Sequence, residues 1–308
     1  MAGPRPSRPP EPGQAPRVRA APLRNAPGRT DAPRPEAPRA AVPREPAREV
    51  LRAPAPAVAP AAPPRPAGPA APRGSVWLHG IHAVAAALAN PARRPKRLLL
   101  TEEAEANLLA RLPQPWPIAA ERIERARLDH LLGRDTVHQG AGLLADLLPP
   151  PALTAVLARP GPILVLDQVT DPRNIGATLR SAAAFGAAAV VLQDRNAPEE
   201  TGVMAKAASG ALETMPLLRA VNLARTLVAL KAAGLWVVGL DAGAPPLRGT
   251  ALSERRVVLV LGAEGDGMRR LVRETCDELA GLAMPGVMES LNVSAAATLA
   301  LYELTRPA

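Results

Sequence analysis

The strongest constraint on the fold is an alternation of apolar, strand-like runs with helical patterns in the second half of the chain. The apolar runs occupy 163–167, 188–193, 235–241 and 257–262, with a weaker one at 278–284, and the helical patterns occupy 174–185, 222–233, 267–275 and 292–304. Strands that alternate with helices predict a parallel sheet with helices on both faces. Because ligands of such sheets bind beyond the carboxyl ends of the strands, the loops there are the candidate site.

Residues 1–74 have a different composition from the rest of the chain. They hold 21 of the 38 prolines and no aromatic residue, which predicts a disordered tail with polyproline II character. They also carry 13 arginines against 5 acidic residues, a balance of +8 that leaves +1 of the chain's +9 for residues 75–308. Two interpretations of the tail stay open: an arginine-rich arm that strengthens RNA binding through phosphate contacts, or a solvated extension without a specific partner.

The remaining chain divides into three further segments. Residues 75–148 predict a small α/β domain, 149–161 a linker with a short helix, and 162–308 the parallel-sheet domain. Within the small domain we expect helices at 82–90, 102–112 and 125–133, and strands at 96–100, 116–120 and within 138–147.

Two compositional features exclude whole classes of protein. The chain has no run of 18 apolar residues, so no transmembrane helix is expected. Its single cysteine, Cys276, excludes an intrachain disulfide and a cysteine-rich metal site. We therefore expect a cytoplasmic protein with no membrane contact and no metal.

The first candidate loop is "VTDPRNIGATLRSAAAFG", which runs from Val169 to Gly186 after an apolar strand. Asn174 stands where a helix would start, so by itself it predicts a helix cap. Arg180, by itself, is more typical of a solvated helix charge than of a catalytic group. Small residues at 177, 181 and 184 form a stripe that favours close helix packing.

The second candidate loop, "VVLVLGAEGDGM" at 257–268, follows a buried strand and places glycines around Glu264. Glycines allow backbone groups to approach a ligand closely, although a tight turn with a surface glutamate explains the same pattern. The spacing differs from the G-x-G-x-x-G of dinucleotide folds, so a nicotinamide-dependent oxidoreductase fits poorly. In the third loop, a Pro-Gly turn precedes "SLNVS", where Ser290 or Asn292 could cap an apolar helix.

Taken in order, "NIGATLRSA", "LVLGAEGDGM" and "MPGVMESLNVSAAATLALYE" resemble the three signature motifs of the SpoU/TrmH family of RNA ribose 2′-O-methyltransferases. The elements "GIHAV" at 80–84 and "VHQG" at 137–140 resemble the amino-terminal domain of the branch that methylates a guanosine of 23S ribosomal RNA. The resemblance implies a SPOUT-type α/β fold with a carboxyl-terminal trefoil knot, preceded by a small RNA-binding domain. It also implies a homodimer that uses S-adenosylmethionine.

The resemblance also implies roles for individual residues. In the family the arginine matched by Arg180 faces the target ribose and activates its 2′-hydroxyl, as a base or by electrostatic stabilisation. The other positions matched in the catalytic set are Asn174, Glu264, Ser290 and Asn292, and those matched at the cofactor are Gly262, Gly267, Leu282, Met284 and Leu291. Ala283 departs from the family, where many members have proline, and Glu213 is expected near the edge of the site.

The expected function is therefore S-adenosylmethionine-dependent methylation of a ribose 2′-hydroxyl, on a guanosine of 23S ribosomal RNA. Two alternatives stay open: a transfer RNA substrate, and a non-catalytic RNA-binding or ribosome-assembly factor that kept the fold. The second alternative predicts loss of some signature polar residues, and all five are present.

Overall fold

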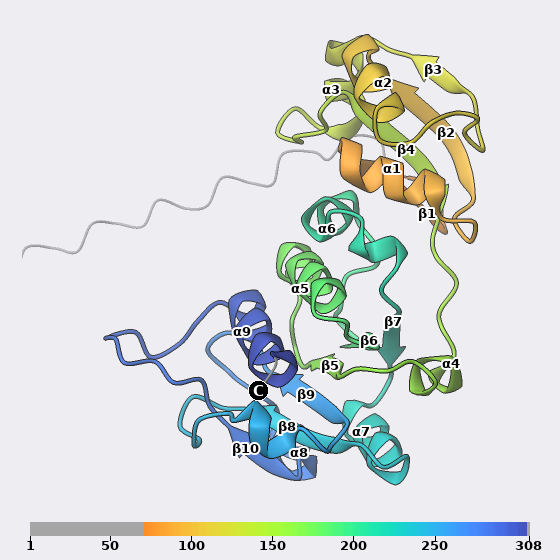
Figure 1. Cartoon of the computed structure of the whole chain (residues 1–308). Coiled ribbons are helices and arrows are strands. Elements are labelled where there is room, and N and C mark those ends of the chain that lie inside the picture. Colours follow the sequence, from red (N-terminus) through yellow and green to blue (C-terminus); the bar gives the residue numbers. More distant parts are fainter. Residues whose placement is uncertain (1–70, 307–308) are drawn as a thin grey trace, which may run out of the picture. The chain divides into compact units, whose positions relative to one another are not determined.

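The computed structural model describes residues 71–306 and contains two β-sheets (Figure 1). The predicted tail at 1–74 lies outside the described residues, except for 71–74. Within the described residues, no helix is both long and apolar enough to cross a bilayer.

The first sheet has four strands in the order β1-β4-β2-β3. β4 pairs antiparallel with β1 and β2, and β2 pairs parallel with β3. The three predicted helices and two of the three predicted strands are confirmed, whereas β1 was not predicted and β3 lies later than expected. The elements are β1 (Ser75–His79), α1 (Ile81–Ala89), β2 (Pro95–Leu100), α2 (Glu102–Leu109), β3 (Ala120–Arg122), α3 (Arg125–Leu132) and β4 (Ala141–Asp146).

The second sheet has six strands in the order β10-β8-β9-β5-β6-β7, and every neighbouring pair is parallel. This confirms the predicted α/β class; β7 and α6 were not predicted. The strands are β5 (Ile163–Leu166), β6 (Ala189–Gln193), β7 (Leu217–Ala220), β8 (Trp236–Leu240), β9 (Val257–Leu261) and β10 (Glu278–Ala280). The helices are α4 (Leu153–Leu157), α5 (Pro172–Ala184), α6 (Gly202–Ala208), α7 (Leu223–Ala232), α8 (Arg270–Thr275) and α9 (Val293–Thr305), with 3₁₀ turns at Ala211–Glu213 and Gly249–Leu252.

Successive residues of the central strand β5 face opposite sides of the large sheet. Leu164 and Leu166 belong to a hydrophobic cluster with residues of α5, α6 and α9, whereas Ile163 and Val165 belong to a second cluster with residues of α4, α7 and α8. Figure 1 shows α5 and α9 across the sheet from α7 and α8. The apolar runs of the sequence are therefore continuous because both faces of the sheet are covered.

The strand order places a switch point beside β5. From β5 the chain proceeds through β6 to β7 on one side, while β9, β8 and β10 lie on the other. In open parallel sheets the crevice at such a point, beyond the carboxyl ends of the strands, is where ligands bind. The loops that follow β5, β6, β8, β9 and β10 all lie at this edge.

Helix α5 packs closely against two other helices. A Cβ atom added to Gly176 would stand 2.4 Å from the Met204 carbonyl oxygen of α6, so only glycine allows this approach. On another face of α5, Ser181 Oγ lies 2.6 Å from Thr298 Oγ1 of α9. Close helix packing was predicted from the small residues of α5, and Ser181 is one of the predicted stripe.

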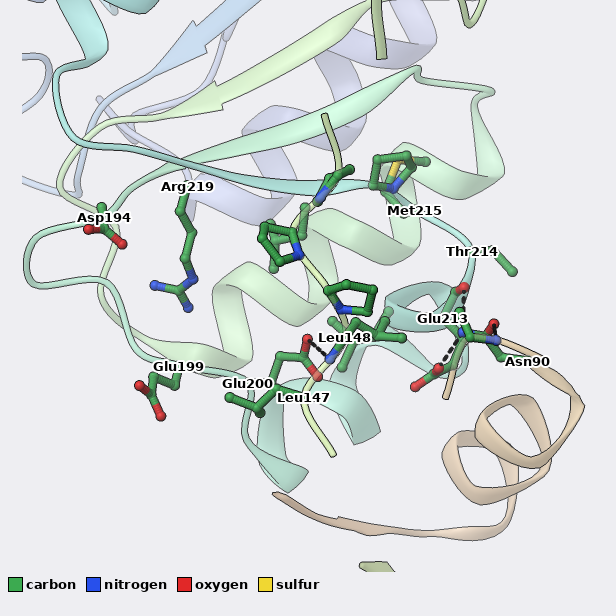
Figure 2. Close-up of a pocket in the computed structure, with 17 residues that line it drawn as sticks. Asn90, Leu147, Leu148, Asp194, Glu199, Glu200, Glu213, Thr214, Met215 and Arg219 are labelled. Atoms are coloured by element: carbon green, nitrogen blue, oxygen red, sulfur yellow. Dashed lines mark hydrogen bonds between the residues drawn. The ribbon is translucent and has the colours of Figure 1, made fainter. Parts of the chain in front are cut away.

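A buried arginine joins the segment between α1 and β2 to the large-sheet half of the chain. Arg93 pairs with Glu213 at 2.7 Å and with Glu200 at 2.8 Å, and it donates to the Asp146 carbonyl oxygen at 2.8 Å. Its side chain is 0% exposed, and that of Glu213 is 2% exposed. Asn90 Nδ2 donates to Glu213 Oε2 at 2.8 Å (Figure 2). Glu213 therefore belongs to this junction, and its predicted place at the edge of the site is wrong.

We expect Arg93→Ala to lower the free energy of unfolding by about 3–5 kcal/mol, because it leaves the buried Glu213 carboxylate without its cationic partner. Urea unfolding followed by circular dichroism measures the change. Arg97→Ala is the matched control, since the Arg97–Glu121 pair spans 2.8 Å with side chains 45% and 51% exposed. It should cost less than about 1 kcal/mol. Equal losses in the two variants would contradict a special role for the buried pair.

Candidate functional site

One carboxylate oxygen joins three segments that lie far apart in the sequence. Glu264 Oε1 accepts hydrogen bonds from Asn174 Nδ2 at 3.3 Å and from Asn292 Nδ2 at 2.8 Å. It also accepts one from the Val293 amide at 3.2 Å. Asn292 Nδ2 donates in addition to Asn174 Oδ1 at 3.0 Å. The structure thus brings together Asn174, Glu264 and Asn292 of the predicted catalytic set, and we call these three residues the Glu264 cluster.

Asn174 reaches this cluster because another residue caps α5. The N-cap is Asp171, whose carboxylate accepts a hydrogen bond from the Arg173 amide at 2.8 Å, and Pro172 occupies the first turn. Proline suits that position because its missing N–H would have had no partner there. The expectation that Asn174 caps the helix is therefore wrong, and its side chain is available to Glu264.

Asn292 does cap a helix, as the local pattern predicted, and it joins the cluster as well. Its Oδ1 accepts hydrogen bonds from the Ser294 amide at 2.9 Å and from Ser294 Oγ at 2.6 Å, which begins α9. Its Nδ2 is the atom that donates to Glu264 and Asn174. The two ends of one amide therefore connect the start of α9 to the cluster.

The loop that carries Glu264 folds back on itself through its glycines. The Gly267 amide donates to the Ala263 carbonyl at 3.0 Å, and a Cβ atom on Gly262 would stand 2.0 Å from the Gly267 carbonyl carbon. Gly265 and Gly267 have φ angles of 87° and 66°, which residues with side chains rarely adopt. These glycines therefore close the loop itself, besides leaving its backbone open to a ligand.

A cavity of about 320 Å³ lies at the carboxyl ends of β8, β9 and β10. Its wall combines apolar side chains with the backbone of the glycine-containing loop, and its volume suits a small-molecule site. Glu264 and Ser290 of the predicted catalytic set line it. So do all five residues predicted to contact the cofactor, namely Gly262, Gly267, Leu282, Met284 and Leu291. We call this space the β8–β10 cavity.

Asp241 is a wall residue of the β8–β10 cavity that the sequence patterns did not single out. The Gly243 amide donates to its carboxylate at 3.1 Å and Arg273 Nε donates at 3.0 Å. These contacts, the Gly243 amide first, lower the pKa of Asp241, so it offers an anionic acceptor to a ligand's hydroxyl or amino groups. Its position at the end of the apolar run 235–241 was the signal that could have found it.

Arg180 and Ser290 lie apart from the Glu264 cluster's hydrogen bonds. Arg180 is on α5 and is exposed, and it makes no side-chain hydrogen bond or ion pair with any residue of 71–306. Ser290 is exposed at the rim of the β8–β10 cavity. A guanidinium that no carboxylate engages keeps its donors for an anionic or polar substrate group.

A second ion pair, which local sequence patterns did not predict, holds the carboxyl end of the glycine-containing loop. Asp167 follows β5 and is 0% exposed. Its carboxylate accepts hydrogen bonds from the Arg269 amide at 2.8 Å and from Arg269 Nε at 2.9 Å, and an Nη2 contact spans 2.7 Å. A buried carboxylate needs such pairing. The contact therefore connects the end of β5 to the residue that precedes α8.

A larger cavity, of about 450 Å³, lies beside the 147–151 segment and β7 (Figure 2). Two of its four carboxylates are already engaged, because Glu213 binds Arg93 and Glu200 accepts a hydrogen bond from the Leu148 amide at 3.2 Å. No residue of the predicted catalytic or cofactor set lines it. Its size alone therefore does not make it the candidate site.

Comparisons with known proteins agree with this geometry. Residues 161–302 match the model of the SpoU rRNA Methylase family, and residues 77–151 match that of the RNA 2′-O ribose methyltransferase substrate binding domain. The chain is 39% identical over 243 residues to the 23S rRNA (guanosine-2′-O-)-methyltransferase RlmB of Haemophilus ducreyi, which covers 74% of this chain and 96% of that protein. The RlmB of Ralstonia nicotianae is 43% identical over 241 residues, with 74% and 94% covered.

The fold is also that of a solved methyltransferase. The SpoU methyltransferase AviRb from Streptomyces viridochromogenes, determined in complex with the cofactor AdoMet, superimposes with a TM-score of 0.63. The match covers 76% of this chain and 90% of AviRb, at 23% sequence identity. At that identity the similarity establishes the architecture alone.

We expect Glu264→Ala to speed hydrogen exchange at the Val293 amide roughly tenfold, because a hydrogen bond to a charged group contributes about 1.5 kcal/mol. Amide exchange measured by nuclear magnetic resonance tests this. Asp266→Ala is the matched control, since Asp266 lies on the same loop and makes no hydrogen bond within residues 71–306. Unchanged protection of Val293 in Glu264→Ala would show that the carboxylate does not hold the start of α9.

Proposed function

The chain belongs to the SpoU rRNA methylase family, and from this premise we propose that it is an enzyme that methylates the ribose 2′-hydroxyl of a guanosine in 23S ribosomal RNA. S-adenosylmethionine is the methyl donor. The relatives named for this reaction are matched over 94–96% of their own length, so the similarity includes the substrate-binding part as well as the methylase part. Since ribosomal RNA is the substrate, the cytoplasm is the place of action.

The observation that carries the proposal is the position of the Glu264 cluster beside the β8–β10 cavity. The cluster joins the three motif loops, and Glu264 itself lines the cavity. A nucleoside-like cofactor fits this lining, because Leu282 and Leu291 offer apolar surface to a base and the Gly262–Gly267 backbone offers donors and acceptors. Asp241 adds an anionic acceptor for hydroxyl or amino groups.

Methyl transfer to a ribose hydroxyl requires only a few contributions from the protein's own side chains. S-adenosylmethionine supplies a methyl group already activated on a sulfonium. What the chain must provide is alignment of the ribose hydroxyl and stabilisation of the negative charge that develops on its oxygen. We assign the second task to Arg180, whose guanidinium is exposed and unpaired within residues 71–306. An arginine normally stays protonated, so this electrostatic role is favoured over that of a base.

We assign the other predicted catalytic residues to positioning. The Glu264 cluster holds the start of α5 and the start of α9 together, which fixes the helix that carries Arg180 relative to the cavity. Ser290 lines the cavity, and we assign it a contact with both substrate and cofactor.

RNA binding is assigned to residues 75–148 and methyl transfer to 162–308, with 149–161 as the linker. The matches of the substrate-binding model at 77–151 and of the methylase model at 161–302 support this division. The buried Arg93–Glu213 pair supports a firm connection between the two parts.

A homodimer is also part of the proposal. Leu299 and Tyr302 of α9 are 48% and 54% exposed, and Met288 in the preceding loop is 69% exposed. A second copy that covers this surface would bury apolar side chains and add groups to the open side of the site near Arg180.

The carboxyl-terminal segment is proposed to be threaded as a trefoil knot. The connection between β8 and β9 contacts Gly281, shortly before the third motif, and Glu303, the last residue of that motif. Leu247 N donates to the Gly281 carbonyl at 2.7 Å, and Gly249 N donates to Glu303 Oε1 at 3.2 Å. Contacts of this connection with both ends of the 281–303 segment support the proposal that the segment is threaded through it, as a knot requires.

A ribose-methylation map of total RNA from cells with and without the gene tests the function. We expect one 2′-O-methylguanosine to disappear from 23S ribosomal RNA. Loss from a transfer RNA would keep the reaction and overturn the substrate. If every site persists, and the purified protein does not bind S-adenosylmethionine in calorimetry, the non-catalytic assembly factor is the correct interpretation.

Arg180→Ala should reduce the rate of methyl transfer about 10²–10³-fold, the cost of removing a donor that stabilises developing negative charge. Incorporation of labelled methyl groups into ribosomal RNA measures the rate, and calorimetry should show unchanged S-adenosylmethionine affinity. Arg225→Ala removes the same charge from the exposed surface of α7 and should retain full activity. Full activity in Arg180→Ala as well would remove the role from this residue.

A further inference from the structure

A second cavity adjoins the β8–β10 cavity at the same edge of the sheet. It has a volume of about 340 Å³ and lies at the carboxyl ends of β5, β6 and β9, and we call it the β5–β6 cavity. Ala263 and Asp266 line both cavities, so the glycine-containing loop after β9 is the wall between them. A group bound in the β5–β6 cavity would therefore be a direct neighbour of a molecule in the β8–β10 cavity.

The β5–β6 cavity is lined by polar side chains that the protein does not use internally. Six of them make no side-chain hydrogen bond or ion pair with any residue of the described part: Gln168, Thr170, Gln193, Arg195, Asn196 and Asp266. Arg269, the other cation of the cavity, is paired with the buried Asp167. Convergent polar groups without internal partners are typical of a recognition site.

Two of these residues also have unusual backbone conformations. Gln168 has a φ of 63° and Asn196 a φ of 68°. Asparagine tolerates the left-handed region, but for glutamine it costs free energy that ordinary packing would not require. Such residues cluster where a loop must present particular groups to a ligand. Both stand in loops that directly follow strands, at the edge where substrates bind in parallel sheets.

The sheet order sets Arg195 and Asp266 on opposite sides of the cavity. β5 lies between β9 and β6, so the loops that carry Asp266 and Arg195 start two strand spacings apart, about 10 Å. This leaves room for a planar base with a hydrogen bond on each edge. Gln168 follows β5, the middle of these three strands, and therefore lies between the loops that carry Arg195 and Asp266.

We propose that the β5–β6 cavity binds the guanine base of the target nucleotide, with Arg195 at the N7 and O6 edge and Asp266 at the N1 and N2 edge. Arginine matches the two acceptors of guanine with its paired donors, and a carboxylate accepts from the N1–H and N2–H groups that adenine lacks in this arrangement. The inference rests on the proposed function, because it takes the base from the nucleotide whose ribose is methylated.

The composition of the cavity favours a base over a backbone phosphate. Asp266 would repel a phosphate, and Gln168 and Gln193 offer both donors and acceptors, which suit the mixed edges of a base. Arg195 and Asp266 are thus specificity-determining residues, separate from the groups that act on the ribose.

The test uses a 23S ribosomal RNA fragment in which the target guanosine is replaced by inosine, which lacks the N2 amino group, or by 7-deazaguanosine, which lacks N7. Rates are taken at saturating S-adenosylmethionine, since Asp266 also lines the β8–β10 cavity. We expect each replacement to lower kcat/KM of the wild-type protein about tenfold. Asp266→Ala should no longer distinguish inosine from guanosine, while still distinguishing 7-deazaguanosine.

Arg195→Lys should show the converse pattern, because lysine keeps the charge but lacks the paired donors. It should lose discrimination against 7-deazaguanosine and keep that against inosine. Arg225→Ala, whose side chain lines neither cavity, is the control and should behave as the wild type. If both cavity variants discriminate as the wild type does, the assignment is overturned. A uniform loss on all three RNAs would indicate phosphate binding and overturn it equally.

The failure of this inference and the failure of the proposed function give different results. If the function is wrong, the wild-type protein does not methylate the guanosine-containing fragment, and both conclusions fall together. If only the inference is wrong, the wild-type protein methylates the fragment and the two variants keep the wild-type ratios between substrates.

Discussion

The arrangement of the site depends on one carboxylate oxygen, Glu264 Oε1, which accepts hydrogen bonds from the beginnings of two helices. Parallel strands bring their following loops to one edge of a sheet, but they do not fix the loops against one another. The Glu264 oxygen fixes these loops against one another, because Asn174, Asn292 and the Val293 amide must all converge on it to donate their hydrogen bonds. The glycines around Glu264 let the loop close tightly enough to present that point.

The buried Asp167 carboxylate, paired with the partly exposed Arg269, fixes the other end of the same loop. Because the Asp167 carboxylate is fully removed from water, its attraction to Arg269 mainly offsets that desolvation cost, and the contact serves chiefly to define one geometry. Here it neutralises one arginine at the carboxyl edge and leaves Arg195 as an unpaired cation beside it. Two arginines at this edge of the sheet therefore differ in role: Arg269 supports the loop, and Arg195 is available to a ligand.

Local sequence predicted the elements whose signals are local. Continuous apolar runs marked β5, β6, β8 and β9, since strands covered on both faces need no polar alternation. The four residues of β7 lack such a run, and β1 reads as the start of a globular segment, so both were missed. Motif resemblance identified Asn174 and Glu264, but their contact spans 90 residues and comes from the sheet order. The Arg93–Glu213 pair, 120 residues apart, had no local signal, and Glu213 was consequently assigned to the wrong place.

The net charge is distributed unevenly between residues 1–74 and residues 75–308, and this bears on how RNA is bound and selected. Residues 75–308 carry a balance of only +1, and several of their arginines, including Arg93, Arg97 and Arg273, are paired with carboxylates. Long-range attraction from this part to a polyanion is therefore weak, and RNA recognition must come from contacts at short range. Arg180 and Arg195 are unpaired within 71–306 and lie on the loop-and-helix edge that carries the site. The net charge of +8 on residues 1–74 would instead strengthen binding to any RNA, whatever its sequence, and this binding would weaken as the salt concentration rises. Selection of a nucleotide must then come from short-range contacts of residues 75–308, whatever the tail contributes to affinity.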